Sequence, residues 1–185
     1  MTEAEWVEQI ALRLRSSGLH DEPGIDVRTG FRLPYRYEAT DYRNGEAATK
    51  HSEFETDLVV GETSAPDIWT PRVVIEAKLG GVTTHDAITY SYKAAAHKSV
   101  HPYLRYGIMV GALYPLPGRL IRHGAHFDFM LVFRDDEPSQ VEWKRFSELV
   151  REEVSASRML QKLVYDNRSV TRDRHALLQR RLIVE

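Results

Sequence analysis

The chain has 185 residues, 42% of them hydrophobic and 28% charged, with no cysteine and a formal net charge of −2. This balance predicts one domain over residues 1–185 with a core of ordinary size, and it argues against wholesale disorder. The lack of cysteine excludes disulfides, thiolate metal sites and a cysteine nucleophile, and it suits a reducing cytoplasm. No apolar run approaches the ~20 residues needed to cross a bilayer, so we expect no membrane partner.

Hydrophobic periodicity and turn signals predict helices and strands in alternation along the chain. The expected elements are a helix over 2–17, strands over 31–37, 54–60 and 72–78, a helix over 84–99, strands over 106–113 and 127–133, and helices over 140–163 and 172–182. The polar stretch 39–52 contains the turn signal Asn44-Gly45, and residues 61–71 are expected to form a loop. This order predicts an α/β (α+β) fold, with one central mixed sheet flanked by helices.

Ionisable residues stand at the ends of the two central strands, with Glu55 and Asp57 on one and Glu76 and Lys78 on the other. Residues two apart on a strand point to the same face, so neighbouring strands would bring Asp57, Glu76 and Lys78 to one point. Two adjacent carboxylates repel unless a cation neutralises them, and such hard oxygen ligands suit Mg²⁺ or Mn²⁺. The lysine could hold a water or a phosphate oxygen. The alternative is a cross-strand salt bridge on a solvated face.

At these residues the sequence resembles the PD-(D/E)xK nuclease superfamily, which has the restriction-endonuclease-like fold. The matching segments are Thr56-Asp57-Leu58-Val59-Val60 and Val73-Val74-Ile75-Glu76-Ala77-Lys78, with Thr56 where the family name has a proline. The family's core order, α-β-β-β-α-β, matches the elements expected over about residues 1–111. The extra C-terminal strand and helices, 112–185, lie outside the resemblance, and we expect them to supply dimer and DNA contacts.

The resemblance implies Mg²⁺-dependent hydrolysis of DNA phosphodiester bonds by a prokaryotic, cytoplasmic enzyme. By carry-over, Asp57, Glu76 and the main-chain carbonyl of Ala77 would bind the metal, and Lys78 would orient the attacking water or stabilise the developing charge. Mn²⁺ could substitute. A compact chain of this kind suits a type II restriction endonuclease, which would act on double-stranded DNA as a homodimer because two strands need two active sites.

Further candidates for the site lie on the two helices. Members of the superfamily often place a glutamate on the first helix, where Glu5 and Glu8 are candidates and Glu8 is preferred; Glu55 is a possible extra metal ligand. On the helix over 84–99, one face carries Asp86, Tyr90, Lys93 and His97, whereas Ile88, Tyr92 and Ala95 or Ala96 are expected to pack on the sheet. In similar nucleases a polar residue of this helix often reaches the active site or the scissile phosphate, so the resemblance implies that Tyr90 and Lys93, and also His97, contact DNA; the alternative is an exposed helix face.

Two other functions also fit this sequence. One keeps the fold but makes the protein a nuclease of DNA repair, recombination or a mobile element. The other is a non-catalytic DNA-binding module that uses the carboxylates structurally. The eight histidines show no short metal-ligand spacing, which disfavours zinc. Residues 161–185 carry a net charge of +3, which suits either a DNA contact or a solvated helical face.

Overall fold

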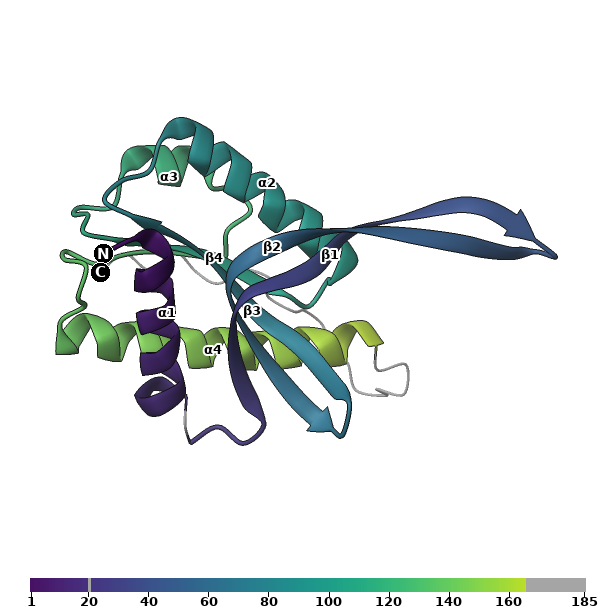
Figure 1. Cartoon of the computed structure of the whole chain (residues 1–185), viewed down its shortest axis with the longest axis horizontal. Coiled ribbons are helices and arrows are strands. Elements are labelled where there is room, and N and C mark those ends of the chain that lie inside the picture. Colours follow the sequence, from purple (N-terminus) through teal and green to yellow (C-terminus); the bar gives the residue numbers. More distant parts are fainter. Residues whose placement is uncertain (20, 166–185) are drawn as a thin grey trace.

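The computed structural model describes residues 1–19 and 21–165, so the helix expected over 172–182 and most of the basic C-terminal segment lie outside the described residues. The elements are α1 Glu3–Arg13, the π-helical turn η1 Leu14–Gly18, β1 Ile25–Arg43, β2 Glu46–Ala65, β3 Ile68–Leu79, α2 Thr84–Val100, β4 Arg105–Gly111, α3 Gly118–His123, β5 Phe129–Val132 and α4 Gln140–Tyr165 (Figure 1). The predicted mixed α+β fold is confirmed.

The strands form one five-stranded sheet in the order β1-β2-β3-β4-β5. β1, β2 and β3 are antiparallel neighbours, whereas β4 lies parallel to β3 and β5 lies parallel to β4. The parallel step from β3 to β4 needs a crossover, which α2 provides. Strand β3 is therefore central, and residues 71–77 on it are all buried.

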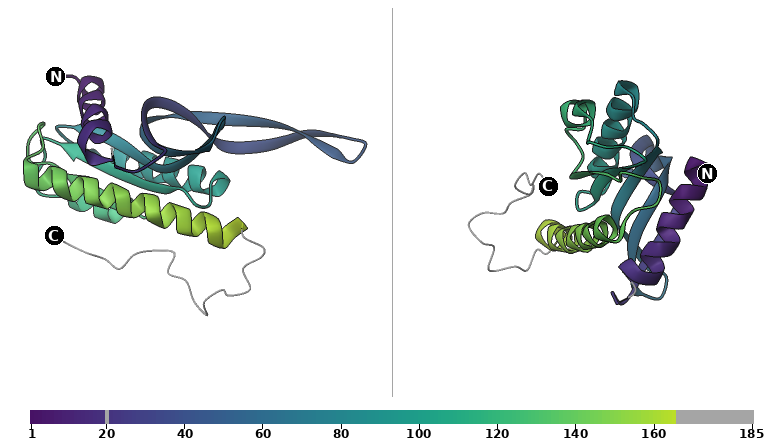
Figure 2. Two further views of the ribbon diagram at one scale, coloured as in Figure 1. Left: turned by 90° about the horizontal axis from the view of Figure 1, so that it is seen from below. Right: turned by 90° about the vertical axis from the view of Figure 1, so that its left-hand side faces the viewer.

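Helices cover both faces of the sheet, as the two views in Figure 2 show. On one face, α1 and α4 contribute Trp6, Ile10, Phe146 and Val150 to a core that includes alternate residues of β3, such as Ile75. On the other face, α2 and α3 pack against intervening strand residues in two smaller clusters. Among the described residues, no helix is both long and apolar enough to span a membrane.

The hairpin of β1 and β2 is much longer than the sequence patterns predict. The expected strands over 31–37 and 54–60 extend to Ile25–Arg43 and Glu46–Ala65, and their outer part projects beyond the helices (Figure 1). Asn44 and Gly45 both have positive φ angles, 52° and 85°, which suit a two-residue hairpin turn. Residues 39–52 escape detection as strands because neither face of a projecting ribbon is buried, so no period-two hydrophobic pattern arises.

The segment 61–71 is likewise strand and not the expected loop. β2 continues to Ala65 and β3 begins at Ile68, so only Pro66 and Asp67 separate them. Asp67 takes a positive φ of 64°. Aspartate tolerates this left-handed conformation, which lets the chain reverse within two residues. The proline at position 71 is accommodated at a break in register between Val60 and Gly61 of β2.

A close approach between helix α1 and strand β4 fixes the position of α1. A Cβ atom at Gly111 would lie 2.5 Å from the ring of Trp6, so only glycine lets the indole rest against the strand. The indole Nε1 donates a hydrogen bond to the Asp136 carbonyl at 2.6 Å, which anchors the other side of the ring. Because Trp6 is 1% exposed, this contact ties the first turns of α1 to the end of the sheet.

We predict that Gly111→Ala destabilises the protein by about 1–3 kcal/mol, because the methyl group must displace Trp6 or the strand. Gly81→Ala is the matched control, since nothing lies within 4 Å of a Cβ at that position. Chemical denaturation measures both free energies of unfolding. Equal effects of the two substitutions would show that the Trp6 contact does not constrain α1.

Candidate active site

Strands β2 and β3 stop pairing next to the predicted catalytic residues. Their last paired residues at this end are Leu58 and Ile75, which leaves the following part of β3 without a neighbour on that side. Two carboxylates take the place of the missing strand. Asp57 Oδ2 accepts the Ala77 N–H at 2.8 Å, and Glu3 Oε2 accepts the Leu79 N–H at 3.1 Å. Two carboxylates therefore line the unpaired edge of β3.

The opening between β2 and β3 places Asp57 beside Glu76, and the charges of Asp57, Glu76 and Lys78 all act on the Tyr90 hydroxyl. Thr56, which replaces the proline of the superfamily name, is buried and donates its hydroxyl to the Phe31 carbonyl at 2.8 Å. It therefore holds the start of this segment to β1. We call Asp57, Glu76, Lys78 and their contacts Glu3, Tyr90 and Lys93 the β2–β3 site.

Glu76 is fully buried at the base of this site. Its Oε1 accepts a hydrogen bond from the Tyr106 hydroxyl and lies 3.5 Å from Lys93 Nζ, whereas Oε2 is buried without a hydrogen-bond partner. Burial, followed by repulsion from the Asp57 carboxylate, raises the pKa of Glu76 to about 7, although Lys93 and Tyr106 act in the opposite direction. A carboxyl group of this kind is half-ionised near neutral pH and has one oxygen available for a cation.

Lys78 is held as a permanent cation beside the carboxylates. Partial burial lowers the pKa of Lys78, but hydrogen bonds to the Tyr90 hydroxyl and to Glu3, whose Oε1 lies 3.1 Å from Nζ, outweigh that effect and raise it above its ordinary value. The ammonium also lies 5.5 Å from the centre of the Tyr90 ring. Lys78 can therefore donate hydrogen bonds or stabilise negative charge, but it is a poor proton acceptor.

The first helix brings Glu3 to the site, whereas the two glutamates expected there, Glu8 and Glu5, have other partners. Glu8 accepts from the Thr29 hydroxyl at 2.7 Å and from Arg15 at 3.3 Å, while Glu5 closes the capping box of α1 with Thr2. Glu3 and Glu8 differ by five positions, which is about 140° around a helix, so they cannot face the same point. Acidic residues at the start of a helix are so common that no sequence signal separates the three.

Helix α2 presents a different face to the sheet from the one expected. Ile88 and Tyr92 are 51% and 65% exposed, whereas the buried residues are Ala87, Ser91, Ala94 and His97. Small side chains at the first three of these positions let the helix approach the sheet closely. Tyr90 and Lys93 border this buried face, so both turn towards the β2–β3 site.

His97 and Glu55 do not take the positions predicted for them. His97 is 0% exposed, its Nδ1 lies 3.2 Å from the Pro34 carbonyl, and burial lowers its pKa to about 4, so it is a neutral core residue and is not accessible to DNA. Glu55 has an exposed side chain, and only its main-chain carbonyl faces α2, at 3.5 Å from Lys93 Nζ. The extra carboxylate at the site is therefore Glu3.

A divalent cation fits the residues at the opening of the sheet. Asp57 and Glu76 supply hard carboxylate oxygens, and Glu76 Oε2 lacks any other partner. The N–H and C=O of one strand residue point the same way, so the Ala77 carbonyl faces the side on which Asp57 accepts its N–H. The residues described here contain no group of three or more His, Asp or Glu side chains placed to hold a metal. The set of two carboxylates and one carbonyl matches Mg²⁺, which keeps several of its waters.

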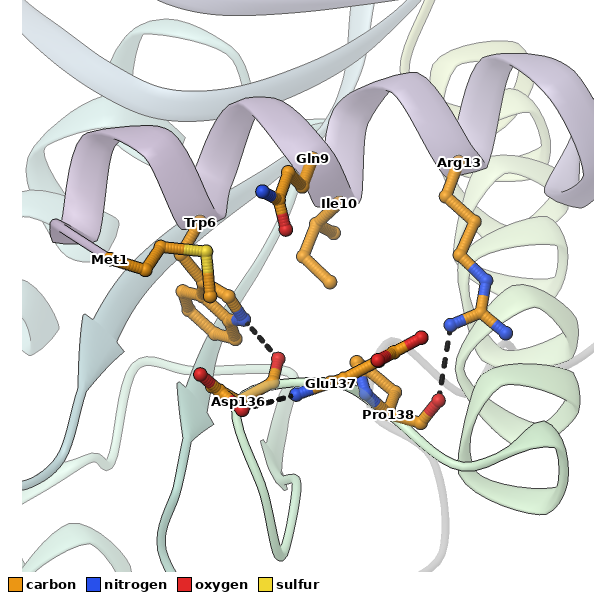
Figure 3. A pocket seen from close by; sticks show the side chains of 8 residues that line it. All are labelled: Met1, Trp6, Gln9, Ile10, Arg13, Asp136, Glu137 and Pro138. Carbon is orange, nitrogen blue, oxygen red and sulfur yellow. Dashed lines mark hydrogen bonds between the residues drawn. The ribbon is translucent and has the colours of Figure 1, made fainter.

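A separate pocket lies between α1 and the loop before α4, with a volume of about 370 Å³ (Figure 3). Its lining residues are Met1, Trp6, Gln9, Ile10, Arg13, Asp136, Glu137 and Pro138, none of which belongs to the β2–β3 site. Hydrogen bonds from Trp6 to the Asp136 carbonyl and from Arg13 to the Pro138 carbonyl cross the pocket. We interpret this pocket as part of the contact between α1 and the loop before α4, which holds α1 in place.

Comparison with models of known protein families and with curated proteins found no match to this sequence. The geometry of the β2–β3 site is therefore the feature that points to a function.

We predict that Glu76→Gln makes the metal-free protein more stable at high pH. Because the pKa of Glu76 is about 7 when folded and its ordinary value is 4.5, the folded state holds this proton more tightly, and its contribution to stability falls as pH rises between those values. Between pH 5 and pH 8 the wild type should lose about 2 kcal/mol relative to the variant, as measured by chemical denaturation in EDTA.

The matched control for this prediction is Glu153→Gln. Glu153 is also buried, but it pairs with Arg105 at 2.5 Å, so its neutral variant should be destabilised at both pH values. A Glu76→Gln variant that is no more stable than the wild type at pH 8 would contradict the burial of an ionising carboxyl group.

Proposed function

We propose that this protein is a Mg²⁺-dependent DNA endonuclease with a restriction-endonuclease-like fold, acting on double-stranded DNA as a homodimer in the manner of a type II restriction endonuclease. The observation that carries the proposal is that Asp57, Glu76 and Lys78 lie around Tyr90 at the point where β2 and β3 separate. The strand order β1-β2-β3-β4, with three antiparallel strands and a crossover helix, supports the superfamily resemblance.

Each residue of the β2–β3 site has a role that follows from its contacts. Asp57, Glu76 and the Ala77 carbonyl would hold the cation, which when bound polarises the phosphoryl oxygen and lowers the pKa of a bound water. Lys78, kept charged by Glu3 and Tyr90, donates a hydrogen bond to the attacking water or to a phosphate oxygen. Lys93 forms an ion pair with Glu76 and partly neutralises the charge of that side chain while the carboxyl group is ionised.

The β2–β3 site is rich in carboxylates, although the proposed substrate is negatively charged. Asp57, Glu76 and Glu3 would repel a phosphate backbone, but a bound divalent cation together with Lys78 and Lys93 reverses that local sign. DNA binding should accordingly depend on the metal as well as on basic side chains elsewhere.

We predict that plasmid DNA is cleaved in Mg²⁺ or Mn²⁺ and not in EDTA, and that Asp57→Asn and Lys78→Ala each reduce the rate by about 100-fold or more. Asp135→Asn and Lys144→Ala are matched controls on exposed positions and should retain full activity. Equal activity of all variants with and without metal would contradict the mechanism. Discrete, mappable ends support restriction, whereas nicking that depends on branched or damaged DNA would assign the enzyme to repair or recombination.

We predict that Glu3→Gln lowers the cleavage rate by about tenfold, because Lys78 loses the charged partner of its ammonium group. Glu8→Gln is the matched control, since Glu8 lies on the same helix but binds Thr29 and Arg15. Both rates are measured at saturating Mg²⁺. A larger loss of rate in Glu8→Gln than in Glu3→Gln would show that Glu8, which the sequence favours, is the first-helix glutamate of the site.

A further inference from the structure

Tyr106 lies on β4, next to the strand that carries Glu76. The parallel register pairs Tyr106 with Val74 and Ile108 with Glu76, so Tyr106 and Glu76 are diagonal neighbours. Residues two apart on a strand point to the same face, and Val74 and Tyr106 pack against Ala94 of α2. Tyr106 is 0% exposed, and its hydroxyl donates a hydrogen bond to Glu76 Oε1. The phenol therefore reaches the β2–β3 site from inside the protein.

The orientation of the Tyr106 side chain is fixed by contacts of both its main chain and its ring. The main-chain N–H donates to Asp128 Oδ2 at 2.7 Å, and the main-chain carbonyl accepts the Asp128 N–H at 2.7 Å. The ring stacks on that of His97, with centres 5.7 Å apart and an interplanar angle of 22°. His97 Nδ1 in turn lies 3.2 Å from the Pro34 carbonyl. The Tyr106 hydroxyl is therefore held towards Glu76.

The two oxygens of the Glu76 carboxyl group have different surroundings. Oε1 accepts from the Tyr106 hydroxyl and lies 3.5 Å from Lys93 Nζ, whereas Oε2 is buried and has no hydrogen-bond partner. The terminal torsion of a glutamate has broad minima, so the partners of the carboxyl group set the direction of its oxygens. Buried acceptors normally have a partner, and an open one beside a second carboxylate, that of Asp57, suits a cation.

We infer that Tyr106 is a positioning residue of the β2–β3 site: its hydroxyl holds Glu76 Oε1 and thereby keeps Oε2 available for the cation. The inference rests on the cation site of the proposed function and adds a residue that acts through a metal ligand. Hydrogen-bond partners of this kind orient the ligand, and their loss typically lowers metal affinity by about 10- to 100-fold. Lys93 is a poor substitute, because it lies 3.5 Å from the same oxygen and its own charge repels a cation.

A purely structural role for the Tyr106 hydroxyl predicts a different result. A buried tyrosine needs an acceptor for its hydroxyl group, and Glu76 could serve that purpose alone. Removal of the hydroxyl would then alter the stability of the protein and leave its affinity for metal unchanged. Metal affinity therefore separates the two roles.

The test is a titration of Tyr106→Phe with Mn²⁺ at pH 8, monitored by the loss of the free-ion electron paramagnetic resonance signal. We expect the dissociation constant to rise about tenfold relative to the wild type, with an unchanged circular dichroism spectrum in EDTA. The rate of DNA cleavage should return close to the wild-type value at saturating Mn²⁺, because Asp57, Glu76 and Lys78 are all retained. A loss confined to metal affinity is what a positioning residue produces.

Two further variants complete the comparison. Tyr103→Phe is the matched control, because Tyr103 is half-buried in the turn before β4 and its ring contacts His101 and Arg72; its affinity for Mn²⁺ should equal that of the wild type. Tyr106→para-aminophenylalanine keeps the ring and a hydrogen-bond donor, so it should recover most of the affinity that Tyr106→Phe loses.

The outcomes distinguish this inference from the nuclease proposal. Equal Mn²⁺ affinity of the wild type and Tyr106→Phe would overturn the role of Tyr106 and leave the nuclease proposal intact. Weaker Mn²⁺ binding by Tyr106→Phe, together with a wild type that cleaves no DNA, would support the role of Tyr106 and contradict the nuclease proposal. A wild type that binds no Mn²⁺ would overturn both.

Discussion

The end of main-chain pairing between β2 and β3, just beyond Leu58 and Ile75, determines the rest of the site. A paired strand would satisfy the N–H groups of Ala77 and Leu79, and its absence leaves them to the carboxylates of Asp57 and Glu3. These two hydrogen bonds place acidic side chains beside Glu76 and Lys78 on β3, whose residues 71–77 are all buried. The docking of Trp6 against Gly111 matters because it sets the position from which Glu3 reaches β3.

The site maintains a carboxylate where the solvent cannot stabilise it. Glu76 is buried beside Asp57, and only Lys93 and the Tyr106 hydroxyl offset its charge. Such an arrangement costs folding stability near neutral pH and gains nothing for the fold, which is why it indicates a functional role. The buried pair of Arg105 and Glu153 shows the contrasting case, in which a buried carboxylate on α4 forms a direct ion pair with an arginine of β4.

Sequence patterns located the strand residues of the site because the alternation of a buried strand is a strong local constraint. Glu76 and Lys78 lie on β3, and Asp57 lies on its neighbour, as the spacing requires. The same patterns could not determine how helices rotate against the sheet. The sequence offered Glu5 and Glu8 as the first-helix candidates and not Glu3. It also placed Ile88 on the inner face of α2, because packing depends on small residues such as Ala87 and Ala94 whose partners lie far away in sequence. The long hairpin was missed since its exposed residues carry no burial pattern.

We propose that the opening between β2 and β3 binds a divalent cation through Asp57 and Glu76. The most direct measurement is a titration of the metal-free protein with Mn²⁺ at pH 8, monitored by the loss of the free-ion electron paramagnetic resonance signal. We expect saturable binding that is lost in Asp57→Asn and retained in the exposed control Asp135→Asn. Equal Mn²⁺ binding by the wild type and Asp57→Asn, or none by either, would contradict it.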